Sequence, residues 1–138
     1  MASTLTAKVM DAAVSRIATY AAGLPIDLAL PNVKYDPVSD TTYLQVDFIP
    51  NGNTSISNDP TDNEYFDLLQ ITVVYPKHQG DVAAFDIAGG VIEHFKSNTK
   101  IDAGTFTFRV NGQPVMANPF TDKAWRRLPV TISLQTLS

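Results

Sequence analysis

Two kinds of side chain in this 138-residue sequence could take part in chemistry: histidines and clustered carboxylates. The histidines are His78 and His94, and no acidic residue stands at a metal-ligand spacing from either in a recognised pattern. A metal site needs two or three convergent ligands, so both are interpreted as surface histidines. The chain has no cysteines, which excludes disulfides and thiolate metal sites.

The carboxylates Asp59, Asp62 and Glu64 could gather around a calcium ion. Their order does not match the twelve-residue calcium loop, so a solvated acidic loop is favoured. A carboxylate pair for glycoside cleavage would come from this group or from Asp36 and Asp40, and nothing in the sequence fixes their separation. Motifs for a nucleophilic serine or a phosphate-binding loop are also missing from the sequence. We therefore expect no catalytic residue, no metal, no cofactor and no enzyme activity.

The sharpest local feature is Trp125-Arg126-Arg127, which lies close to Lys123. One interpretation is a large core anchor beside two solvated cations. The other is a hot spot of a protein interface, because tryptophan and arginine dominate such hot spots. Both interpretations stay open at the level of the sequence. Three cations are too few for firm binding to a DNA backbone, so no sequence-specific nucleic acid is expected as a partner.

The charges are strongly polarised along the chain. Between Tyr35 and Pro76 there are seven acidic residues and no lysine or arginine, whereas the other residues hold ten basic and seven acidic groups. The net charge of the whole chain is −4. Such polarity suits contacts between unlike surfaces, including copies of the chain stacked head to tail.

Two segments are candidates for these unlike surfaces, the acidic residues 36–67 and the basic residues 96–127. The second segment carries six basic and two acidic residues, a net charge of +4. The residues expected at a subunit or partner interface are Asp59, Asp62, Glu64, Asp67, Arg109, Lys123, Trp125, Arg126 and Arg127.

The elements that position these residues follow from the spacing of apolar side chains. A single apolar stripe predicts an amphipathic helix that begins near Leu5, capped by Ser3 or Thr4, and ends at Gly23 and Pro25. A second helix is predicted after Gly80, with Asp81 as its cap. Alternating apolar and polar residues predict half-buried strands over residues 42–50, 64–75, 105–110 and 127–137. A short strand over residues 27–30 is possible before them.

Residues 51–63 are rich in polar and turn-forming types and are predicted to form an exposed loop. The strand at 64–75 is longer than usual, so part of it is expected to project with this loop as a long hairpin arm. Asn111-Gly112 is a strong two-residue hairpin signal, with residues 113–117 as the returning strand. Gly89-Gly90 lies in the middle of the second helix, where glycine lowers helix stability. The simplest compensation is close packing of the helix on the sheet, and the alternative is a kink.

The order of these elements predicts an α+β fold, with a mostly antiparallel sheet and two helices packed on one face. The length fits one domain over residues 1–138. The first residues lack the pattern of a signal peptide, and no run of about 18 apolar residues exists. The lack of cysteines favours synthesis in the cytosol, and no membrane partner is expected.

The order of the predicted elements also resembles that of a known protein family. Tyr43-Leu44-Gln45-Val46 opens the first long strand, and Val73-Val74-Tyr75-Pro76 runs directly into Gly80-Asp81 and a helix. With the first helix and the closing alternating strand, this resembles the tail terminator (tail completion) proteins of long-tailed, non-contractile bacteriophages. The resemblance covers about residues 4–136, and the family carries no catalytic residues.

The resemblance implies a structural virion protein that forms a ring, typically of six subunits, at the head-proximal end of the tail tube. Such a ring stops tube polymerisation and offers a joining surface. Its partners would be other copies of itself, the tail tube protein and a head-completion or neck protein, with DNA passing through the lumen. The alternatives are another neck or tail-tube component, or a monomeric protein-binding module.

Overall fold

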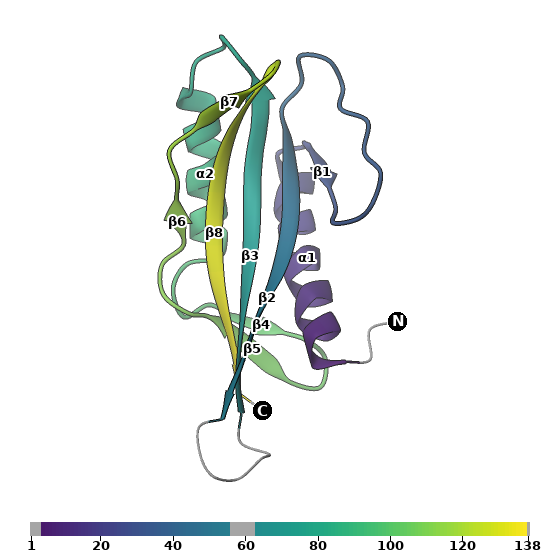
Figure 1. Cartoon of the computed structure of the whole chain (residues 1–138), viewed down its shortest axis with the longest axis vertical. Coiled ribbons are helices and arrows are strands. Elements are labelled where there is room, and N and C mark those ends of the chain that lie inside the picture. The colour runs from purple at the N-terminus through teal and green to yellow at the C-terminus, as the bar shows by residue number, and fades with distance from the viewer. Residues whose placement is uncertain (1–3, 56–62, 138) are drawn as a thin grey trace.

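The computed structural model describes residues 4–55 and 63–137. Within them two helices and eight strands form one sheet-and-helix unit, shown in Figure 1. The helices are α1 (Leu5–Gly23) and α2 (Val82–His94). The strands are β1 (Asp27–Ala29), β2 (Tyr43–Ser55), β3 (Asn63–Pro76), β4 (Lys100–Asp102), β5 (Thr107–Val110), β6 (Val115–Met116), β7 (Phe120–Asp122) and β8 (Trp125–Leu137). The α+β fold with a mostly antiparallel sheet is therefore confirmed.

Three long strands, β2, β3 and β8, form the centre of the sheet, and β3 lies between the other two. β3 and β8 are antiparallel and pair over thirteen consecutive positions, from Glu64 opposite Leu137 to Pro76 opposite Trp125. β1 lies parallel to β2 at one edge. At the other edge β5, β6 and β7 follow one another along β8, and β4 pairs with β5.

Helix α1 begins and ends where its sequence predicts. The Thr4 hydroxyl accepts a hydrogen bond from the backbone N–H of Ala7 at 3.2 Å, which satisfies one free donor of the first turn. The buried residues of the helix are Val9, Ala13, Ile17 and Ala21, at the predicted spacing. This stripe faces the sheet, so α1 is held by apolar burial along its whole length.

Helix α2 buries small side chains. Ala84, Ala88 and Val91 face the core, whereas Val82 is 77% and Phe85 is 41% exposed. Gly90 faces α1, because a Cβ atom there would overlap the Tyr20 hydroxyl. That hydroxyl donates a hydrogen bond to the carbonyl of Ile87 at 3.0 Å. Gly90 therefore allows the two helices to approach each other closely. The prediction that it allows α2 to pack closely on the sheet is wrong.

A reciprocal pair of hydrogen bonds also joins the helices. Arg16 donates through Nε to the carbonyl of His94 at 2.9 Å, and His94 Nε2 donates to the carbonyl of Arg16 at 3.1 Å. Burial of the imidazole, together with the Arg16 cation, lowers the pKa of His94. The imidazole is half-buried, so the prediction of a surface histidine is wrong for His94. His78 is exposed as predicted.

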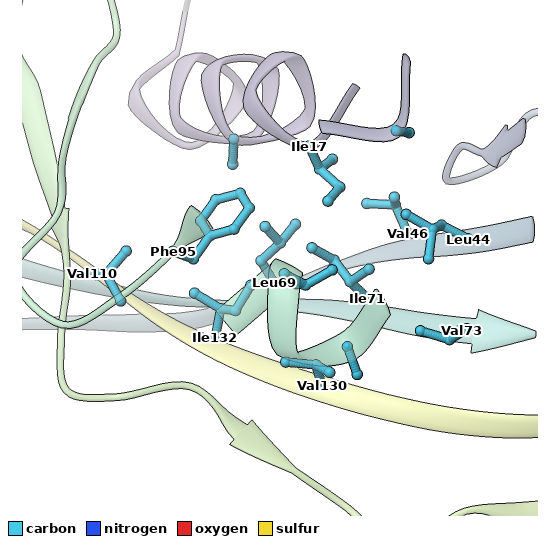
Figure 2. Close-up of a cluster of buried hydrophobic side chains, with 14 of the residues drawn as sticks. Ile17, Leu44, Val46, Leu69, Ile71, Val73, Phe95, Val110, Val130 and Ile132 are labelled. Carbon is cyan, nitrogen blue, oxygen red and sulfur yellow. The ribbon is translucent and has the colours of Figure 1, made fainter. Parts of the chain in front are cut away.

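The main core lies between the two helices and one face of the sheet, as Figure 2 shows for part of it. Alternate residues of the long strands point into it, and they are fully or almost fully buried. From the three long strands these are Leu44, Val46, Leu69, Ile71, Val73, Leu128, Val130, Ile132 and Leu134. Because α1 and α2 cover the same face of the sheet, neither helix covers the other face (Figure 1).

Two predictions about connections are wrong. Residues 51–55 belong to β2, so the strands of the arm extend into the segment predicted as a loop. Backbone pairing along the ladder outweighs the low strand propensity of these residues. Asn111-Gly112 does not form a two-residue hairpin, because β5 and β6 both pair with β8 and not with each other. It instead separates β5 from β6, which pair one after the other with β8.

Candidate subunit interface

The predicted residues Lys123, Trp125, Arg126 and Arg127 lie together at one end of the sheet. They occupy the two-residue turn between β7 and β8 and the first positions of β8, where Asp122 pairs with Trp125. Lys123 is exposed and has a positive φ of 59°, as a tight turn requires. The two arginines are consecutive residues of a strand, so they point to opposite faces of the sheet.

Arg126 points toward the helices and is fixed by an ion pair. Its Nε donates to Asp81 Oδ1 at 2.8 Å, and the Tyr75 hydroxyl donates to the same oxygen at 2.6 Å. The bonds from Arg126 and Tyr75 lower the pKa of the Asp81 carboxyl below its usual value. The prediction that Asp81 caps α2 is confirmed for its position and wrong for its side chain, which makes no capping bond.

Arg127 points to the opposite face, which the helices leave open. Its Nε lies 3.4 Å from Asp122 Oδ2, and its Nη1 donates to Gln45 Oε1 at 3.0 Å. The first contact joins β7 to β8, and the second crosses β3 to reach β2. Both predicted arginines therefore have partners within their own chain, and each keeps part of its side chain accessible.

Trp125 anchors a small second cluster on the open face. Its ring meets Tyr43 edge-on at 5.6 Å, and Tyr43 in turn contacts Tyr35 at 4.8 Å. The Tyr35 hydroxyl donates to Asp27 at 2.9 Å, and burial together with this bond raises the pKa of Tyr35 to about 12. The tryptophan is half-buried, so it is a packing anchor whose remaining surface is accessible.

The predicted acidic residues lie at the other end of the long strands or outside the described residues. Asp59 and Asp62 are outside, and Glu64 pairs with Thr54 and Leu137 at the far end of β3. Asp67 is only 4% exposed and shares the helix-covered side of β3 with the core.

Twelve residue steps along β3, or about 40 Å, separate Glu64 from the basic end at Pro76. Arg109 lies near the acidic end, where it pairs with Gln135 and donates to Asn98 at 2.9 Å. The structure therefore groups Lys123, Trp125, Arg126 and Arg127. Among the described residues it separates them from Glu64, Asp67 and Arg109.

The sequence interpretation missed the apolar surface at the two edges of the sheet. Eight of the nine exposed large hydrophobic side chains among the described residues lie beside β1 and α1 or on α2, β6 and β7. Near β1 they are Leu24, Leu30, Val33 and Val38, and on the other flank Val82, Phe85, Val115 and Phe120. A signal was available, because residues 30–38 and 115–120 carry apolar side chains without the regular spacing of a buried element.

A family model described as phage tail terminator protein matches residues 8–134. The chain belongs to the phage tail terminator family. This tail terminator is accordingly a structural protein of the phage tail and a component of the virion, where it contacts other virion proteins. No curated protein sequence matches the chain significantly.

Two solved structures share the fold of this tail terminator. One, described only by a sequence identifier, is similar with a TM-score of 0.79 and 21% identity over 99% of this chain and 97% of its own. The other is a chain in the virion of a native gene transfer agent particle, with a TM-score of 0.64 and 15% identity over 99% of this chain and all of its own. At these identities the likeness shows the fold alone.

Two further properties of this tail terminator concern the described part of the chain only. No group of three or more histidine, aspartate or glutamate side chains there is placed to hold a metal ion. Neither of its helices has the length and apolar character needed to cross a bilayer.

Proposed function

We propose that this tail terminator forms a ring, six subunits in number, on the head-proximal end of the tail tube. The ring stops polymerisation of the tube protein and then offers a joining surface to the head or neck. The observation that carries this proposal is the family match over residues 8–134, which spans almost every element of the fold.

The two unlike edges of the subunit support a ring. A cyclic assembly needs a heterologous contact, in which one patch of each subunit meets a different patch of its neighbour. Here the β1 edge and the β6–β7 edge lie on opposite sides of the three long strands (Figure 1), and both expose apolar side chains. A contact between two such unlike edges, repeated from copy to copy, forms a ring when the rotation between neighbours closes.

The proposed partners follow from the position of the ring. One of its faces contacts the last ring of tube protein, the other contacts a head-completion or neck protein, and DNA passes through the lumen. The hairpin arm formed by the far ends of β2 and β3 (Figure 1) is suited to reach a neighbouring ring. The protein is made in the host cytoplasm and enters the virion with the completed tail.

Electron microscopy of phage that carries a nonsense codon in this gene tests the proposal. The expected result is tail tubes of uncontrolled length that are not joined to heads, with normal tails restored when the wild-type protein is supplied from a plasmid. Tubes of normal length that fail to join heads would instead make the protein a neck component. Intact virions of normal form in its absence would contradict both functions.

A further inference from the structure

The C-terminal end of α2 is joined to the middle of α1 through His94 and Arg16. Arg16 Nε donates to the His94 carbonyl at 2.9 Å, and His94 Nε2 lies 3.1 Å from the Arg16 carbonyl. A carbonyl can only accept a hydrogen bond, so the imidazole carries its hydrogen on Nε2 in this contact. Acid therefore adds the second proton at Nδ1, to which no group among the described residues is hydrogen-bonded.

The His94 imidazole is half-buried between aromatic rings. The Tyr20 ring lies 5.5 Å from it, and the Phe95 ring meets it edge-on at 5.6 Å. Phe95 is fully buried in the main core, where Figure 2 shows its ring. Such surroundings remove part of the water that would stabilise a positive charge, and this burial is the main cause of the lowered pKa of His94.

A permanent cation is held against the same histidine. The Arg16 guanidinium is bonded to the His94 carbonyl, and its central carbon lies 5.6 Å from the centre of the Phe95 ring. Held from two sides, it stays close to the imidazole. Its charge lowers the pKa of His94 further. The hydrogen bond to the Arg16 carbonyl acts in the opposite direction and is the weakest of the three causes.

The other charged groups around the imidazole do not reverse this balance. Lys100 and Asp102 of β4 line a pocket of about 460 Å³ together with His94, and their charges are opposite. The Tyr20 hydroxyl stays neutral, because burial raises its pKa. His94 is the last residue of α2, where the helix dipole favours a cation. Arg16 already supplies that cation at the terminal carbonyl, so a second one gains little.

We propose that the Arg16–His94 contact is acid-sensitive: protonation of His94 sets two cations against each other across the paired hydrogen bonds and releases the end of α2 from α1. The pocket beside His94 gives water access to the ring. The folded-state pKa of His94 lies below its ordinary value of 6.5, so the stabilisation is complete above pH 6.5 and is lost as the pH falls through the lower folded value. Both residues belong to one subunit, so the inference does not depend on the ring.

A histidine NMR titration of the purified full chain tests the electrostatic part of the proposal. His94 of the wild type should titrate below pH 6.5. Arg16→Gln should move this titration up toward 6.5, whereas Arg16→Lys, which keeps the positive charge, should move it less. An arginine that acts only through packing would give equal titrations in the two variants. That result, or a wild-type His94 that titrates at or above pH 6.5, would overturn the proposal.

Hydrogen exchange measured at pH 7.5 and pH 5.5 tests the release of α2. After correction for intrinsic exchange, amides of the last turn of α2 should lose protection by about threefold or more at the lower pH, while amides at the centre of β3 keep theirs. His94→Gln retains a side-chain N–H for the Arg16 carbonyl and cannot be protonated, so it should abolish the loss. The matched control His78→Gln replaces an exposed histidine and should leave the loss unchanged.

The wild type and the His78→Gln control decide the outcome even if His94→Gln does not fold. Full protection of α2 at pH 5.5 in these two proteins would contradict the proposal. An equal loss in α2 and β3 would mean that acid unfolds the whole subunit and does not act at this contact. Where His94→Gln folds, a loss as large as that of the wild type would assign the pH dependence to another group.

Discussion

The Arg126 guanidinium donates two hydrogen bonds to the Asp81 carboxylate, from Nε to Oδ1 at 2.8 Å and from Nη2 to Oδ2 at 3.3 Å. The pair joins the start of β8 to the start of α2, and the Tyr75 hydroxyl adds the end of β3 at 2.6 Å. The end of β3 and the start of α2, which follow each other in the sequence, are thus joined to the distant strand β8 through one carboxylate. Such a bidentate arrangement fixes geometry as well as charge.

The first prediction concerns how the contribution of the Arg126–Asp81 ion pair to stability depends on pH. The folded-state pKa of Asp81 is lowered below its ordinary value of 3.8, so its contribution to stability is present above that value and is lost as the pH falls through the lower folded pKa. Asp81→Asn should therefore lower the thermal midpoint at pH 7, and the difference from wild type should vanish toward pH 2. Thermal melts by circular dichroism at several pH values measure this.

The control for that experiment is Asp86→Asn, which removes an exposed carboxylate from the same helix. Its midpoint should stay close to that of wild type throughout the pH range. A deficit of Asp81→Asn that is equally large at pH 7 and pH 2 would show that the charge of Asp81 does not act through the ion pair.

The second prediction compares two adjacent glycines of α2. A Cβ at Gly89 meets nothing within 4 Å, so Gly89→Ala should raise the free energy of unfolding by up to about 1 kcal/mol through helix propensity. A Cβ at Gly90 would overlap the Tyr20 ring, with 2.8 Å to Cζ, so Gly90→Ala should lower it by about 1–3 kcal/mol. Urea unfolding of both variants measures the difference. Equal effects would mean that Tyr20 does not pack against Gly90.

The third prediction concerns the main core. Leu69 is fully buried at the centre of β3, so Leu69→Ala should lower the free energy of unfolding by about 2–5 kcal/mol. Leu24 is 39% exposed at the end of α1, so Leu24→Ala should cost less than about 1 kcal/mol. Urea unfolding curves give both values. A small loss for Leu69 would mean that the sheet does not pack against the helices as described.

The fourth prediction concerns the charge at the β7–β8 turn. Lys123 is exposed in the turn between β7 and β8, at the basic end of the sheet, so Lys123→Glu should weaken assembly by up to roughly fivefold at low salt and less at high salt. Lys100→Glu changes an exposed lysine of β4, near the other end of β8, and should have little effect. Binding of labelled protein to tails made without it measures both. Loss of binding in both variants would indicate net charge rather than position.

Much of the fold could be predicted from local patterns. The stripe of α1 and the alternation of β8 have one dominant period each, and both elements formed with their apolar residues inward. The Asn111-Gly112 hairpin failed because a turn signal does not say which strand is the partner. Here β8 is long enough to pair with β5, β6 and β7 in succession, and this long-range pairing overrides the local preference.

The candidate interface could be predicted only in part. Composition marked Trp125, Arg126 and Arg127 as unusual, and the structure brings them to an accessible end of the sheet. The sequence alone could not show that Arg126 forms an ion pair with Asp81, since the two residues are 45 positions apart. Nor could it show that Phe120 lies level with Asp27, because that relationship passes through three other strands.

The thirteen-position register between β3 and β8 has a mechanical consequence. A force along the strands loads all the paired positions of β3 and β8 at the same time, so their hydrogen bonds must break together. A force across the strands at the end of the sheet loads one pair at a time, so the strands separate more easily. A subunit of this design tolerates tension along its long axis far better than force applied sideways at the arm.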